Sequence, residues 1–169
     1  LNSDVERKST LSEKRNLLQF YRNQLQDINA HESTVDSVAD RGEMLGSANV
    51  QDNLSQLRSR LSKLQATASQ HLAQCEVLVD QHQQFQDKLQ HANDWLQVHK
   101  VRLASSEHMA TDKMAVQARL DKMEALLQAL PDGEDRMRVV QKAGAEVCEE
   151  TAEDGQKLIQ REVDWLVQS

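Results

Sequence analysis

The sequence predicts an all-α protein that is built on an internal repeat and contains one long helix. Two observations lead to this prediction. An apolar seam runs without a break from Leu54 to Leu103, and no Gly or Pro occurs between Ser47 and Leu130. The apolar pattern also recurs after 102 residues. Alternating spacings of three and four residues place apolar side chains on one stripe of a helix, and such a stripe requires helical partners.

The seam predicts which side chains of the long helix are buried against partner helices. Twelve of its fifteen positions are apolar and the other three are histidine. The positions are Leu54, Leu57, Leu61, Leu64, Ala68, His71, Cys75, Leu78, His82, Phe85, Leu89, Ala92, Leu96, His99 and Leu103.

The composition of the chain argues against several classes of function. The chain has 169 residues, 38% apolar residues and a net charge of −7. That charge argues against nucleic-acid binding and against contact with an anionic membrane surface. No apolar run approaches the roughly 18 residues of a membrane span, and we expect no signal peptide in this segment. The two cysteines, Cys75 and Cys148, favour a reducing cytosolic setting over a disulfide framework.

The repeat aligns two copies of one apolar pattern without a gap. Identity between the copies is low, so the apolar positions carry the signal. Matched pairs include Leu18 with Leu120, Tyr21 with Met123, Leu25 with Leu127, Gly42 with Gly144, Leu57 with Ile159, Leu61 with Val163, and Leu64 with Leu166.

Capping and breaking residues place four helices. We expect the first to open with a capping box over residues 3–6. We expect a kink or short break in the third at Leu130–Gly133, because Pro131 removes a backbone hydrogen bond, with Asp132 or Asp135 restarting the helix. The expected ranges are Asp4 to Leu45, Asn49 to Leu103, Thr111 to Val147, and Asp154 to Ser169.

A unit of just over 100 residues with this helix order resembles the spectrin repeat. The best local match is the segment from Phe85 to Leu96, in which Trp95 follows an aromatic residue by ten positions. The resemblance implies tandem three-helix bundles joined by one continuous long helix, with both ends truncated. It divides the chain into partial repeats at residues 1–80, with helices B and C, and 81–169, with helices A, B and part of C. Residues 126–133 and 155–166 look most like repeats of the nesprins.

The expected bundle core follows from the seam and its repeat. An incomplete first bundle would leave a partner face exposed, to be covered by further chain, a second copy or a partner helix. The core residues are Leu54, Leu57, Leu61, Leu64, Leu78, Phe85, Leu89, Trp95, Leu96, Leu103, Leu120 and Leu127. The partner face consists of Leu18, Tyr21, Leu25 and Ile28.

No arrangement of residues predicts chemistry. His71 and Cys75 have the i, i+4 spacing of half a metal site, but the second half is missing, so seam packing explains them better. No site meets the requirements of a catalytic centre. We therefore expect neither an enzyme, nor a metal, nor a cofactor. Trp165 aligns with Lys63, an outward position, and exposed Trp is a common interface anchor.

The expected function is that of a structural spacer and protein-docking module. The nesprin resemblance implies a cytoplasmic linker that tethers the nuclear envelope to the actin cytoskeleton at the outer nuclear membrane. The partners it implies are cytoskeletal and actin-associated, with a formin-type actin regulator among them. Self-association through incomplete bundles is a further expectation. The alternative is the dimeric coiled-coil stalk of a motor or tethering protein.

Overall fold

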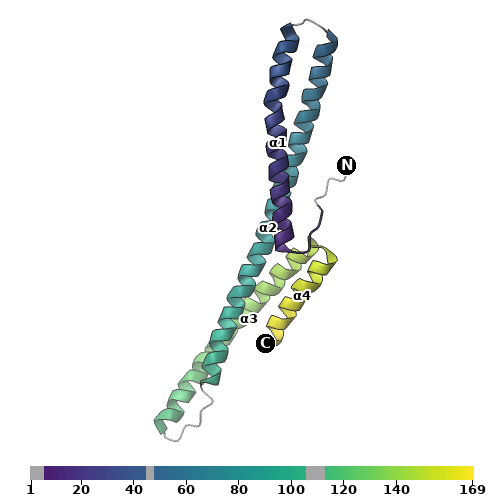
Figure 1. The fold of residues 1–169 in the computed structure, drawn as a ribbon. Helices are drawn as coiled ribbons and strands as arrows, with labels where there is room; N and C mark the ends of the chain where they lie inside the picture. Colours follow the sequence, from purple (N-terminus) through teal and green to yellow (C-terminus); the bar gives the residue numbers. More distant parts are fainter. Residues whose placement is uncertain (1–5, 45–47, 106–112) are drawn as a thin grey trace. The chain divides into compact units, whose positions relative to one another are not determined.

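The described residues of the protein form four helices. The structure is a computed structural model that describes residues 6–44, 48–105 and 113–169. The helices are α1 (Leu11–Met44), α2 (Ala48–Ala104), α3 (Lys113–Glu149) and α4 (Glu153–Gln168) (Figure 1). No strand occurs in these three ranges. The prediction of an all-α fold is therefore confirmed.

The chain divides into two compact units, residues 1–80 and residues 81–169. Helix α2 contributes residues to both, because it extends without interruption from Ala48 to Ala104. The absence of Gly and Pro from this stretch explains its continuity, since each of them weakens a helix interior.

In the first unit, α1 and the first part of α2 form an antiparallel pair (Figure 1). Ion pairs link the helices, among them Arg22 to Glu76 and Arg58 to Asp36, both at 3.0 Å. All four side chains are about half exposed, so each pair contributes little to stability. The earlier α1 residue pairs with the later α2 residue, and the later with the earlier. This is the order that an antiparallel helix pair requires.

In the second unit, the latter part of α2 packs with α3 and α4 around a closed core (Figure 1). Each helix supplies apolar side chains at three- and four-residue spacings, as expected for a helical bundle. The buried members are Phe85, Ala92, Val140, Ala143, Val147, Ile159, Val163 and Leu166.

The turn between α3 and α4 is fixed by side-chain hydrogen bonds to the end of α3. The Thr151 hydroxyl donates to the Val147 carbonyl. The Gln156 amide donates to the carbonyls of Cys148 and Thr151, at 3.0 and 2.9 Å. These bonds satisfy carbonyl groups that lose their partners at a helix end. Glu153 provides negative charge in the first turn of α4, where the helix dipole favours it.

Helix α1 begins later than we expected. Residues 3–5 of the expected capping box lie outside the described residues, and Glu6 precedes the helix. The helix instead opens with a capping box at Thr10 and Glu13. The Glu13 backbone N–H donates to the Thr10 hydroxyl at 3.2 Å, and the Thr10 N–H donates to the Glu13 carboxylate at 3.0 Å.

Of the expected kink or short break at Pro131, the break does not occur, because α3 continues through the proline. The segment is held against α2, since Gly133 is buried beneath the Trp95 ring. Asp132 does not restart a helix; its carboxylate accepts a hydrogen bond from Arg136 at 2.9 Å. Contacts beyond the proline thus outweigh the loss of one backbone hydrogen bond. The expected start of this helix at Thr111 or Asp112 lies outside the described residues.

None of the helices in the described ranges combines the length and the apolar character that crossing a lipid bilayer requires.

Candidate interaction surfaces

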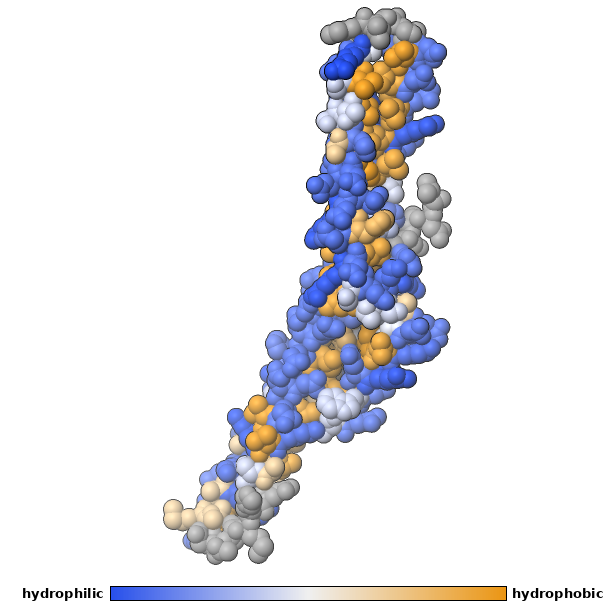
Figure 2. Space-filling model, in the orientation of Figure 1, coloured by the Kyte–Doolittle hydropathy of each residue, from blue (hydrophilic) through white to orange (hydrophobic). Residues whose placement is uncertain are grey.

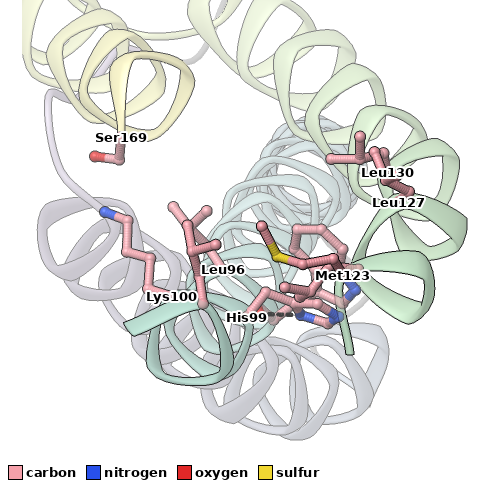
Figure 3. A pocket seen from close by; sticks show the side chains of 10 residues that line it. Leu96, His99, Lys100, Met123, Leu127, Leu130 and Ser169 are labelled. Atoms are coloured by element: carbon pink, nitrogen blue, oxygen red, sulfur yellow. Dashed lines mark hydrogen bonds between the residues drawn. The ribbon is translucent and has the colours of Figure 1, made fainter. Parts of the chain in front are cut away.

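An apolar groove lies in the second unit between α2 and α3, with the end of α4 at one side (Figure 3). Its volume is about 420 Å³. Its rim carries Lys100, and Ser169 follows α4 directly. The remaining lining residues are Trp95, Leu96, His99 and Leu103 from α2, and Met123, Leu126, Leu127 and Leu130 from α3.

Trp95 forms one wall of this groove. Its ring stacks on His99, with the centroids 4.0 Å apart, and the His99 Nδ1 atom lies 2.8 Å from the Trp95 carbonyl oxygen. A Cβ atom on Gly133 would lie 2.8 Å from Trp95 Cζ3, which is closer than van der Waals contact permits. The glycine therefore allows α3 to approach the indole.

A second apolar surface lies along the helix pair of the first unit. Figure 2 shows it as an orange strip between polar residues. Leu57 is 46% exposed and Leu64 is 58% exposed. Two leucines on one stripe of α2 are thus left largely in contact with water.

The internal repeat shows what the first unit lacks. Leu57 and Leu64 correspond to Ile159 and Leu166, which are only 3% and 1% exposed. In the second unit this stripe belongs to the core that Phe85 and its α2 neighbours complete. The described residues of the first unit form two helices, and no counterpart to that third helix lies among them. We name the stripe of Leu57 and Leu64 the open face.

The structure brings some predicted core residues together and leaves others at the surface. Leu54 and Phe85 are buried, whereas Leu61, Leu78, Leu89, Trp95 and Leu96 are partly buried. Within this chain Leu57, Leu64, Leu103, Leu120 and Leu127 are exposed, at fractions between 45% and 65%. The exposed leucines lie where only two helices run together.

The predicted partner face is mostly occupied by the chain itself. Leu18 is buried, and Tyr21, Leu25 and Ile28 are partly buried. The Tyr21 ring stacks on His71 of α2, with the centroids 5.2 Å apart. These side chains therefore serve the α1–α2 contact, while their repeat counterparts Met123 and Leu127 line the groove of the second unit.

The seam histidines and Cys75 take part in packing. His82 is buried with its ring edge-to-face against Phe85. Burial raises the pKa of the Cys75 thiol, which disfavours the reactive thiolate. In the described ranges, no three or more His, Cys, Asp or Glu side chains are grouped to hold a metal ion.

One apolar flank of α4 was only half anticipated by the sequence. Trp165 is 62% exposed and Leu158 is 48% exposed, although the helix buries Ile159, Val163 and Leu166 on its other side. Sequence reasoning found Trp165 through its alignment with Lys63. The seven-residue spacing of Leu158 and Trp165 would have revealed the whole flank, because it defines one side of a helix.

These helices and their shared α2 define a protein of the helical-repeat class. The spectrin-repeat profile matches residues 80–169, and the chain belongs to the spectrin-repeat family.

The chain is also similar to the Muscle-specific protein 300 kDa of Drosophila melanogaster. The two are 28% identical over 170 residues, which is 99% of this chain and 1% of that protein. The chain therefore spans about one hundredth of this relative. No solved structure gives a significant match.

Proposed function

We propose that the chain is a structural spacer and protein-docking segment of a large cytoskeletal linker. The observation that carries this proposal is the sharing of α2 between two helical units that both offer apolar surface. A single helix that contributes to two units connects them directly, as a spacer requires. The open face and the groove supply surfaces that a helical partner can cover.

The two units correspond to partial spectrin-like repeats, residues 1–80 and residues 81–169. The first contributes two helices and the second contributes three. Family membership supports this assignment for the second unit, because the profile match begins at residue 80. The 102-residue pattern supports it for the first.

The linker that we propose tethers the nuclear envelope to the actin cytoskeleton from the cytoplasmic side. The resemblance to nesprin repeats supports this finer role, and the similarity to the far longer Muscle-specific protein 300 kDa is compatible with it. The partners are actin-associated proteins, a formin-type actin regulator among them. A structural role rather than an enzymatic one agrees with the family and with the packing role of the seam histidines.

A relocalisation assay tests the docking role. The chain is fused to a mitochondrial outer-membrane anchor in cultured cells, and F-actin and formin-type regulators are imaged around the mitochondria. We expect enrichment of at least one of them. The variant Leu57→Ser with Leu64→Ser changes the open face, leaves the groove of the second unit unaltered and should reduce the enrichment. Mitochondria that gather neither component would contradict the proposal.

A further inference from the structure

The flank of α4 formed by Leu158, Glu162 and Trp165 is not required by bundle packing. Leu158 and Trp165 are 48% and 62% exposed, and Glu162 lies between them on the same side of the helix. We name these three residues the α4 flank. Spacings of four and three residues place all three along one edge of a helix.

Comparing equivalent positions of the two units shows whether the fold requires apolar residues on this side of the helix. At the corresponding positions of α2, the first unit has Gln56, Arg60 and Lys63, and all three are exposed. The same edge of the same repeat is therefore basic and polar in one unit and apolar and acidic in the other. Because polar residues satisfy the fold at these positions, Leu158 and Trp165 need another explanation.

Charge on the α4 flank is not balanced within the chain. Among the described residues, no ion pair or hydrogen bond is formed by the Glu162 carboxylate. Glu162 is an exposed residue, but neighbouring side chains displace part of the water around its carboxyl, and this desolvation raises its pKa. A cation placed beside it would relieve this cost.

The basic edge of α2 offers the complementary groups. Arg60 and Lys63 form no ion pair among the described residues. Arginine and lysine also bind well over the face of an indole, and Trp165 is 62% exposed. One molecule thus carries both halves of a complementary contact, the condition under which copies associate.

We propose that the α4 flank binds the Gln56–Lys63 edge of α2 in a second copy of this chain. In this contact Arg60 pairs with Glu162, Lys63 covers the Trp165 ring, and Leu158 packs on the Gln56 stem. The inference rests on the docking role proposed above and names a second copy as one partner. The contact is weak on its own, because it combines one surface ion pair with one cation–π contact.

Sedimentation velocity over a concentration series tests this contact. We expect reversible self-association that weakens as salt is raised, because exposed charge pairs are screened. Glu162→Lys should raise the dissociation constant by about tenfold, since it sets like charges opposite each other. Asp164→Lys is the matched control: it makes the same charge change on the other side of α4 and should leave association unchanged.

A charge exchange makes the test specific. Combining Glu162→Lys with Arg60→Glu should restore association to near its original strength, whereas each substitution alone weakens it. Circular dichroism verifies that every variant stays helical. A chain that is monomeric throughout would overturn the inference, as would equal effects of Glu162→Lys and Asp164→Lys. If a monomeric chain still recruits actin-associated proteins to mitochondria, the inference fails while the proposed docking role stands.

Discussion

Truncating two leucines that occupy the same position of the repeat should have very different effects. Leu166 is 1% exposed, so Leu166→Ala removes a fully buried side chain and leaves a cavity. Such substitutions cost about 2–5 kcal/mol. Its counterpart Leu64 is 58% exposed, so only about two fifths of that residue is covered. Scaling the roughly 1.5–3 kcal/mol of full burial by this fraction gives about 1 kcal/mol for Leu64→Ala.

Two optical signals separate these effects. Both tryptophans, Trp95 and Trp165, lie in the second unit, so their fluorescence follows the unfolding of that unit. Circular dichroism at 222 nm follows the helices of both units. In urea, Leu166→Ala should lower the fluorescence midpoint strongly, whereas Leu64→Ala should alter only the dichroism curve, and slightly. Equal losses for the two variants would refute the reasoning, because they would mean that the open face is covered in solution.

Three further predictions concern single contacts. Gly133→Ala should destabilise the second unit by about 1–3 kcal/mol despite the better helix propensity of Ala, because its Cβ meets the Trp95 ring; urea unfolding should show the loss shrinking in a Trp95→Leu background. Hydrogen bonding from the Thr10 backbone is the main cause that lowers the pKa of Glu13. Its stabilisation is thus present above the unfolded pKa and lost as pH falls through the folded pKa, and the stability difference from Glu13→Gln should vanish in acid. Burial raises the pKa of Cys75, so iodoacetamide at neutral pH should label it far more slowly in the native chain than in urea, as mass spectrometry can measure; equal rates would contradict its burial.

The helices could largely be predicted from periodicity and capping. The ends of α2 and the start of α4 lie within one residue of the expected positions. The start of α1 was misplaced because two capping-box patterns compete, one at residues 3–6 and one at Thr10–Glu13. A capping box is a local motif, so it does not show which of two possible N-termini the helix uses.

The kink or short break at Pro131 was predicted from the local cost of proline alone. Whether a helix tolerates that cost depends on what lies beside it, and here the Trp95 ring rests on Gly133. The two residues are 38 positions apart in the sequence, and no spacing rule links them. The continuity of α3 through Pro131 thus depends on a tertiary contact, which helix propensity alone does not predict.

Periodicity identifies which residues need a partner, but it does not tell whether the chain contains that partner. Leu64 and Leu166 are the same residue type at the same position of the repeat, yet Leu64 is exposed and Leu166 is buried. The difference comes from the third helix, which the second unit has and the described part of the first unit lacks. Trp165 presents the opposite case: its counterpart Lys63 shows that the position needs no apolar residue at all. An apolar residue at a position that is apolar in both copies of the repeat therefore indicates packing within the bundle. An apolar residue at a position that is charged in the other copy indicates a contact with another molecule.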